Sequence, residues 1–196
     1  MKTLFLDIET VPTPQSLAEA SRQNPDGSID EATIKKMSLS ALNGRILCLA
    51  YAVEPPADGP TELLCGDETA ILTRFWEMVV DVNLFVGHNV LDFDLRFIYQ
   101  RSIIHRIKPS REISFSRFRN SPVFDTMHEW TKWGRDMVGL DALANALNIP
   151  SPKTEMNGSL VYPYYQAGRL DDIHEYCKRD VVTVRKIYHF MTFTSI

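Results

Sequence analysis

Short apolar runs and longer stretches with helical spacing alternate along the chain. A run of four to eight apolar residues between turn signals predicts a buried strand. Pro55-Pro56 and Gly59-Pro60 separate the second run from the third, so these two strands are predicted to form a hairpin over residues 45–65. The runs that predict strands are residues 3–10, 45–53, 62–65, 84–87 and 123–125.

Apolar residues three and four positions apart predict the helices. Asp67 is a predicted N-cap, and Asp30 is a predicted N-cap of a shorter helix. Asp171 or Asp172 with Glu175 predicts a capping box at the start of the last helix. The predicted helices cover residues 31–37, 67–80, 89–104, 140–147 and 171–190. Early strands followed by alternating helices and strands indicate an α/β or α+β domain with one sheet.

Residues 13–44 interrupt this pattern. They are polar and contain Pro14, Pro25 and the turn signal Asn24-Pro25-Asp26-Gly27. We interpret them as an insertion that lies over the sheet. A chain of 196 residues is most often one domain, so we expect residues 1–196 to form one domain carrying this insertion.

The first predicted strand carries two carboxylates, Asp7 and Glu9. Side chains alternate along a strand, so both lie on one face, with their Cα atoms roughly 6–7 Å apart. A buried, ionised carboxylate is unfavourable unless a partner compensates it. Lys2 is the one cationic residue nearby in sequence, so the counter-charge comes from elsewhere in the fold or from a bound cation.

Two later segments carry further candidates. Asp94 falls in the first turns of the helix that follows Gly87, and strand-to-helix junctions collect functional groups in α/β sheets. Asp92 is as well explained as the N-cap of that helix. Tyr176 and Asp180 lie one turn apart on one face of the last helix. Taken alone, an Asp at such a position is more often a solvated flank residue.

The net charge of −4 does not indicate a nucleic-acid-binding protein, but one segment is locally basic. Phe115 and Phe118 accompany these cations, a composition that suits a path for a single strand. Solvated arginines on a helix with phenylalanines in the core explain the same residues equally well. The cations are Arg96, Arg101, Arg106, Lys108, Arg111, Arg117 and Arg119.

Other features bear on the compartment. The three cysteines include no Cys-x-x-Cys pair, which suits free thiols in a reducing cytosol. No run of about 18 apolar residues predicts a membrane span. Asp7 and Glu9 interrupt the apolar start, which disfavours a signal peptide. We therefore expect a cytoplasmic protein that does not contact a membrane.

Together, the carboxylate motifs resemble the DEDD superfamily of 3′–5′ exonucleases. Its Asp-x-Glu motif matches Asp7 and Glu9, and its second motif, Asn followed by Phe-Asp, matches Asn89 and Phe93-Asp94. Its third motif, Tyr-x-x-x-Asp, matches residues 176–180 and marks the tyrosine branch, because the histidine branch requires His at position 175. The first and last segments look like stand-alone relatives of the family-B DNA polymerase proofreading domain.

This resemblance implies an α/β, ribonuclease H-like mixed sheet flanked by helices. It also implies two divalent ions, Mg²⁺ or Mn²⁺, because hard cations prefer oxygen ligands and two ions can activate water and stabilise the leaving oxygen. Tyr176 would position the attacking water. The implied metal ligands are Asp7, Glu9, Asp94 and Asp180, which with Tyr176 form the catalytic set. The predicted substrate-binding residues are Thr10, Asn89, Phe93 and Lys153, the last of which is also explained as an ordinary surface residue.

The implied activity is removal of nucleotides from the 3′ end of single-stranded nucleic acid, with DNA favoured over RNA. A role in DNA repair, with a polymerase or repair partner, is open. The alternatives are a 3′–5′ exoribonuclease, a non-catalytic nucleic-acid-binding module of the same fold, and an endonuclease. A non-catalytic module usually lacks one or more carboxylates, and here each one is present.

Overall fold

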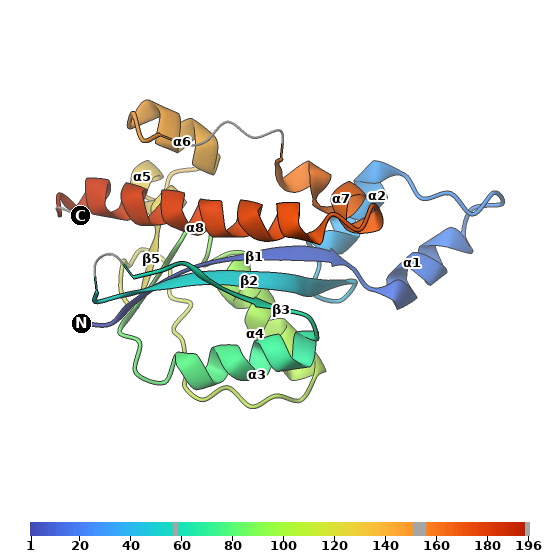
Figure 1. Cartoon of the computed structure of the whole chain (residues 1–196), viewed down its shortest axis with the longest axis horizontal. Helices are drawn as coiled ribbons and strands as arrows, with labels where there is room; N and C mark the ends of the chain where they lie inside the picture. The colour runs from blue at the N-terminus through green and yellow to red at the C-terminus, as the bar shows by residue number, and fades with distance from the viewer. Residues whose placement is uncertain (57–58, 151–155, 195–196) are drawn as a thin grey trace.

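The computed structural model describes residues 1–56, 59–150 and 156–194. Within them, one mixed sheet has the strand order β3-β2-β1-β4-β5 (Figure 1). β2 pairs antiparallel with β1 and β3, whereas β4 pairs parallel with β1 and β5. The strands are β1 (Thr3–Pro12), β2 (Gly44–Glu54), β3 (Glu62–Cys65), β4 (Leu84–Gly87) and β5 (Val123–Asp125). The predicted α/β class, the five strands and the hairpin of β2 and β3 are confirmed.

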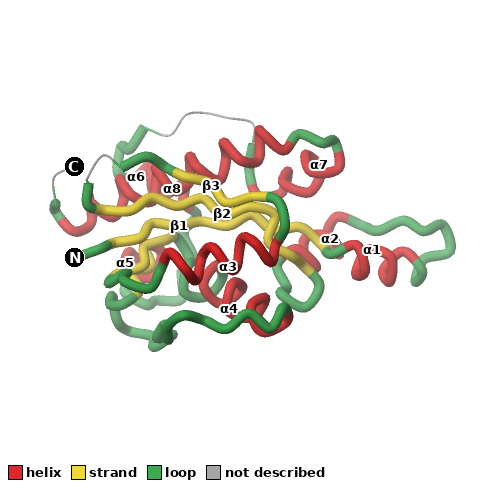
Figure 2. Tube along the Cα trace, turned by 60° about the horizontal axis from the view of Figure 1, so that its bottom comes forward, coloured by secondary structure: helices red, strands yellow, loops and turns green. Residues whose placement is uncertain are grey.

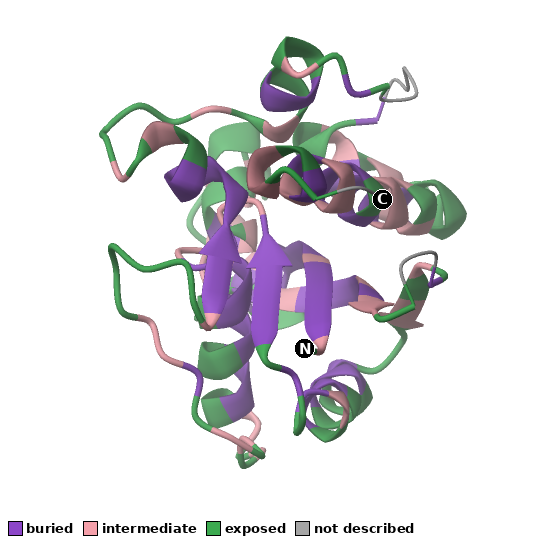
Figure 3. Ribbon diagram, turned by 90° about the vertical axis from the view of Figure 1, so that its left-hand side faces the viewer, coloured by how far each residue is buried: buried purple, intermediate pink, exposed green. Residues whose placement is uncertain are grey.

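Helices cover both faces of this sheet (Figures 1 and 2). α3 (Glu68–Met78) and α4 (Asp94–Ile104) lie on one face, and α8 (Leu170–Thr192) crosses the other. Between these layers, β1, β4 and β5 are almost entirely buried (Figure 3). The shorter helices are α5 (Thr126–Thr131), α6 (Leu140–Ala146), α7 (Val161–Gln166) and a 3₁₀ turn at Gly158–Leu160. No helix in these described ranges is both long and apolar enough to span a membrane.

β1 separates two cores because its side chains alternate. Leu4, Leu6 and Ile8 pack into the core that contains α3 and α4. Phe5 and Val11 pack into the core beneath α8. The odd-numbered residues of β1 therefore face α8, and this parity also determines where the carboxylates of β1 point.

Residues 13–43 connect β1 to β2 through α1 (Pro14–Ser21) and α2 (Glu31–Ser38), and α1 extends beyond the end of the sheet (Figure 1). Asp30 caps α2 as predicted, because its carboxylate accepts the N–H of Thr33 at 2.9 Å. α1 was not predicted, although Thr13 caps it and Pro14 occupies its first turn. α1, α5 and α7 have only six to eight residues each, and their apolar positions show no clear helical period.

One predicted helix start and one predicted cap are wrong. The helix expected from residue 89 begins at Asp94, and its N-cap is Phe93 rather than Asp92. α8 begins at Leu170, with no side-chain cap on its first turn. The expected capping box is absent because Asp171 and Asp172 lie inside the first turn of α8, where neither is the N-cap. Asp172 pairs instead with Arg169, and Glu175 with Lys178.

Gly87 allows the tight exit from β4. A Cβ at this position would lie 2.5 Å from Cβ of Val90 and 3.1 Å from the carbonyl oxygen of Leu6. We therefore expect Gly87→Ala to lower the free energy of unfolding by about 1–3 kcal/mol, the usual effect of overpacking a core. Urea denaturation followed by circular dichroism measures this change.

Gly158→Ala is the matched control, because a Cβ there meets no atom within 4 Å in the described structure. Its effect should stay within about 0.5 kcal/mol. Equal stability of the Gly87→Ala and wild-type proteins would contradict this account of the turn.

Candidate active site

β1 presents Asp7 and Glu9 on the face covered by α8, as the alternation predicts. In the register with β2, Asp7 lies opposite Ala50 and Glu9 lies opposite Cys48. The register shifts directly after Glu9, a β-bulge of the kind often found beside functional sites. The two carboxylates therefore lie at the end of the regular part of the ladder.

Asp94 reaches the same place from the opposite side of the sheet. β4 pairs with β1 only as far as Phe5 and Val86, after which the chain leaves the sheet. The backbone N–H of Ile8 consequently has no strand partner on this side, and it donates to Oδ1 of Asp94 at 3.0 Å. Asp94 is only 3% exposed. Its carboxylate thus fills the opening between β1 and β4.

Asp125 fixes the turn that precedes Asp94 in the chain. It ends β5, and its carboxylate accepts the N–H of Asn89 and the N–H of Leu91, each at 3.0 Å. Asn89 has a φ of 59°, a left-handed conformation that Asn tolerates better than most residues. The sequence pattern predicted Asp125 only as the last residue of a strand. Its position at the carboxyl end of a strand was the available signal for this positioning role.

α8 supplies the remaining candidates. Tyr176 and Asp180 lie one turn apart, and the Tyr176 hydroxyl donates a hydrogen bond to the Asp180 carboxylate. The Arg179 guanidinium lies over the Tyr176 ring, 4.8 Å from its centroid, and its Nε is 3.6 Å from Oδ1 of Asp180. Sγ of Cys177 lies 3.5 Å from Oδ2 of Asp7, so this part of α8 packs directly on β1.

We call Asp7, Glu9, Asp94 and Asp180 the carboxylate cluster. Burial, followed by the charges of the other members, raises the pKa of Asp7 well above its usual value. Burial is also the main cause that raises the pKa of Glu9. Burial raises the pKa of Asp94 to about 8 and the pKa of Asp180 to about 6, the latter against the lowering effect of Tyr176 and Arg179. Arg179 also lowers the pKa of Glu9, but its single charge does not offset the burial of the cluster.

The same surroundings keep Tyr176 neutral. Burial and the charges of Asp180, Glu9 and Asp7 raise the pKa of its phenol above the ordinary value of 10. A group with that pKa does not remove protons from water near neutral pH. Tyr176 can therefore donate a hydrogen bond at the site but does not act there as a base.

The donor set fits a divalent cation. One ligand atom from each of Asp7, Glu9 and Cys177 lies within 4.8 Å of the others. Carboxylate oxygens suit hard cations such as Mg²⁺ and Mn²⁺. A bound cation would favour the ionised forms that burial disfavours. Cys177 was not a sequence-predicted site residue, because its place in the apolar stripe of α8 indicated a core position.

The predicted substrate-binding residues have different surroundings. Thr10 is buried, and its hydroxyl donates to the carbonyl oxygen of Ser38 at 2.8 Å, which ties α2 to the end of β1. Phe93 is half-buried at the start of α4, with its ring centroid 5.5 Å from that of Phe97. Lys153 lies outside the described residues.

The basic segment divides between structural and exposed residues. Arg101 is 6% exposed and forms an ion pair with Glu68 at 2.6 Å, so it does not belong to a nucleic-acid path. Arg111 is also structural, since its guanidinium donates to the carbonyl oxygen of Val82. By contrast, Phe118 is 75% exposed and packs against Trp133, with 5.3 Å between ring centroids.

Comparison with solved structures identifies the fold. A family B DNA polymerase from the hyperthermophilic archaeon Pyrobaculum calidifontis matches with a TM-score of 0.69 and 18% sequence identity. The match covers 98% of this chain but 24% of the polymerase chain, so the protein corresponds to about a quarter of that enzyme. This likeness confirms the predicted ribonuclease H-like fold.

Comparison with protein families is more specific. A search of curated proteins gave no match. A family model described as a predicted 3′–5′ exonuclease related to the exonuclease domain of PolB matches residues 61–195. That range contains Asp94, Tyr176 and Asp180, while Asp7 and Glu9 precede it. Because the match spans more than half of the chain, the protein belongs to this family of predicted exonucleases related to the PolB exonuclease domain.

Proposed function

We propose that the protein is a metal-dependent 3′–5′ exonuclease that removes nucleotides from single-stranded DNA. One observation carries this proposal: four carboxylates from β1, α4 and α8 converge where the sheet opens, and burial raises the pKa of each. Such a concentration of like charge destabilises a fold unless a ligand compensates it. Perturbed carboxylates of this kind are typical of functional sites.

In this proposal the carboxylate cluster holds two divalent cations, Mg²⁺ or Mn²⁺. When bound, such ions polarise the scissile phosphate, activate the attacking water and stabilise the leaving oxygen of an in-line displacement. Asp7 is the proposed shared ligand of both ions, because, besides burial, the charges of Asp94, Glu9 and Asp180 all raise its pKa.

The protein side chains supply orientation. Tyr176 remains a neutral phenol, so its hydroxyl positions the attacking water instead of removing its proton. Membership of the tyrosine branch of the superfamily is part of the same proposal. Asn89, Phe93, Lys153 and Thr10 are proposed to contact the terminal nucleotide.

DNA is the favoured substrate because the structural relative is a DNA polymerase. RNA is the alternative substrate. A protein distinguishes RNA from DNA by contacts to the 2′-hydroxyl. A role in DNA repair and a cytoplasmic location are part of the same proposal, which leaves open whether the partner is a polymerase or a repair protein. A non-catalytic module is less well supported, because none of the four carboxylates is missing from the cluster.

Digestion of a 5′-labelled single-stranded oligonucleotide tests this function. With Mn²⁺ or Mg²⁺, the labelled oligonucleotide should shorten step by step, and EDTA should stop the shortening. Asp180→Asn should reduce the rate by at least about a hundredfold, the usual scale for loss of an electrostatic group at a reacting centre. Tyr176→Phe should lower kcat with little change in KM, because its hydroxyl acts in the transition state.

Asp171→Asn is the matched control, an exposed carboxylate on the same helix that should keep the wild-type rate. Failure of folded wild-type protein to shorten both DNA and RNA oligomers would overturn the proposal. Cleavage of circular single strands would instead indicate an endonuclease.

The proposed metal site also predicts how stability depends on pH. Asp94 ionises near 3.8 in an unfolded chain, whereas burial raises its pKa to about 8 in the fold. The folded state therefore binds the extra proton, and the free energy of unfolding falls as pH rises from about 4 to about 8. In EDTA, the Tm should be lower at pH 8 than at pH 6. Mn²⁺ should raise the Tm more at pH 8, because metal binding displaces protons.

Asp94→Asn removes this titration but keeps an oxygen that can accept the Ile8 N–H, so the Tm of this variant in EDTA should change less between pH 6 and pH 8. A wild-type Tm in EDTA that is the same or higher at pH 8 would contradict the electrostatics described above. Differential scanning calorimetry measures all of these values.

A further inference from the structure

The three cysteines of the chain lie together near one edge of the sheet, although they are far apart in sequence. In the ladder, Cys48 lies opposite Glu9 of β1 on one side and opposite Cys65 of β3 on the other. Directly opposed residues point to the same face of a sheet. Cys48 belongs to the core beneath α8, so Cys65 points to that face too. On α8, the thiol of Cys177 shares a hydrogen bond with the thiol of Cys48.

The three thiols differ in their access to solvent. Cys48 and Cys177 are completely buried, whereas Cys65 is exposed. β3 is an edge strand, and Cys65 is its last residue before Gly66, where a φ of 102° turns the chain. An oxidant in solution therefore reaches Cys65 before it reaches the other two. Redox-sensitive cysteines are usually accessible and stand next to a second cysteine that resolves the oxidised form.

The register of β2 and β3 suits a disulfide between Cys48 and Cys65. Opposed Cα atoms of antiparallel strands are about 4.5–5.5 Å apart. A disulfide joins Cα atoms that are about 4.4–6.8 Å apart, so it can form here without displacing either strand. All three thiols are free in this structure. The reduced protein therefore already holds this pair at the backbone separation that a disulfide needs.

We propose that Cys48 and Cys65 are an oxidation site, which hydrogen peroxide converts to a disulfide. The Cys65 sulfur attacks a peroxide oxygen, the O–O bond breaks, and Cys65 becomes a sulfenic acid as one water is released. The Cys48 sulfur then attacks the Cys65 sulfur, the S–O bond breaks, and a second water leaves. Overall, two thiols lose two electrons and two protons, and the peroxide is reduced to two waters. A dithiol reductant reverses the reaction by thiol–disulfide exchange.

Cys48 connects this oxidation site to the carboxylate cluster. After burial, the Cys48 thiol is the largest cause that raises the pKa of Glu9. Cys48 also bonds to the Cys177 thiol, whose Sγ lies 3.5 Å from Oδ2 of Asp7. A covalent bond to Cys65 draws the Cys48 sulfur away from Cys177, and so changes the surroundings of two proposed metal ligands. Oxidation should therefore weaken Mn²⁺ binding, and this part of the inference rests on the proposed function.

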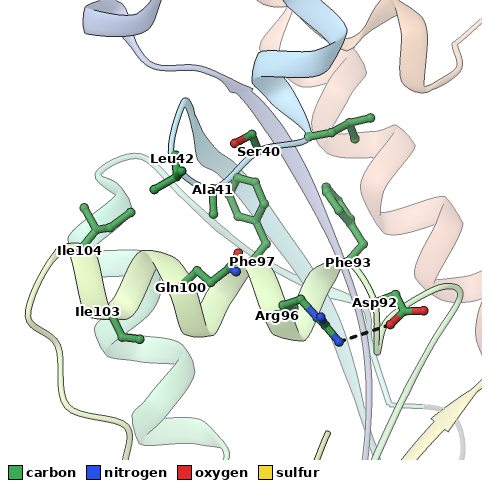
Figure 4. A pocket seen from close by; sticks show the side chains of 11 residues that line it. Ser40, Ala41, Leu42, Asp92, Phe93, Arg96, Phe97, Gln100, Ile103 and Ile104 are labelled. Atoms are coloured by element: carbon green, nitrogen blue, oxygen red, sulfur yellow. Dashed lines mark hydrogen bonds and ion pairs between the residues drawn. The ribbon is translucent and has the colours of Figure 1, made fainter. Parts of the chain in front are cut away.

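The oxidation site is separate from the groove between α4 and residues 39–42 (Figure 4). That groove belongs to the face of the sheet that α3 and α4 cover, whereas the thiols lie on the face beneath α8. None of the three cysteines is among the described residues that line the groove. A change in Mn²⁺ binding on oxidation would therefore arise at the cluster and not in this groove.

Mass spectrometry after treatment with hydrogen peroxide tests the disulfide. The wild-type protein should lose two hydrogen atoms, and peptide mapping without reductant should link Cys48 to Cys65. In the Cys48→Ala protein the resolving thiol is absent, so the Cys65 sulfenic acid should persist and react with dimedone. The Cys65→Ser protein should form no disulfide, and the exposed position makes this variant the one least expected to disturb the fold.

Electron paramagnetic resonance of free Mn²⁺ during a titration tests the connection to the cluster. The oxidised wild-type protein should bind Mn²⁺ about tenfold more weakly than the reduced protein, the usual scale for loss of a contact around a metal ligand. Dithiothreitol should restore the affinity. Cys65→Ser is the matched control, since peroxide should leave its Mn²⁺ affinity unchanged and any loss there would come from damage elsewhere.

Three results would overturn the oxidation site: no disulfide in the wild-type protein, a link between Cys48 and Cys177 in its place, or a disulfide-linked dimer through Cys65. A disulfide that forms without changing the Mn²⁺ affinity would overturn the connection to the cluster. Absence of Mn²⁺ binding by the reduced wild-type protein would overturn the proposed metal-dependent function, and the mass-spectrometric result on the disulfide would stand apart from it.

Discussion

Four carboxylates meet in the opening between β1 and β4, and each of them makes ionisation of the others less favourable. The separation of these two strands creates the opening, since β4 leaves the sheet while β1 continues. Asp94 takes the place of the missing strand by accepting the Ile8 N–H. Asp94 is therefore part of the sheet's own hydrogen bonding, and this bond offsets part of the rise in its pKa that burial causes. A divalent cation would relieve the remaining repulsion.

Several features away from the chemistry maintain this geometry. Gly87 allows the chain to turn out of β4 beside Val90, and Asp125 fixes the turn that follows. On the other face, the buried residues Ile173, Cys177 and Val181 pack α8 on the sheet and so position Asp180. The buried pair of Arg101 and Glu68 holds the loop after α2 beside the same opening. Each of these residues fixes a backbone segment next to the site. The geometry of the site therefore depends on residues other than its four carboxylates.

The sequence predicted the elements with a strong period or a clear boundary signal. β1, α3 and α8 belong to this group, and the alternation along β1 correctly placed Asp7 and Glu9 on one face. The start of α4 was misplaced because the turn before it depends on hydrogen bonds to Asp125, a residue distant in sequence. Arg101 looked like part of a basic surface for the same reason, since its partner Glu68 lies on another helix. A local sequence pattern does not identify hydrogen bonds and ion pairs between residues that are far apart in the chain.

The central claim is that the carboxylate cluster binds two divalent ions, and diffraction from crystals soaked in Mn²⁺ tests it most directly. Data collected at the manganese absorption edge should show two anomalous peaks about 3.5–4 Å apart. Both peaks should lie within coordination distance of the cluster oxygens, with Asp7 contacting each ion. Absence of anomalous density at the cluster under saturating Mn²⁺, with the carboxylates ordered and still buried, would contradict the account.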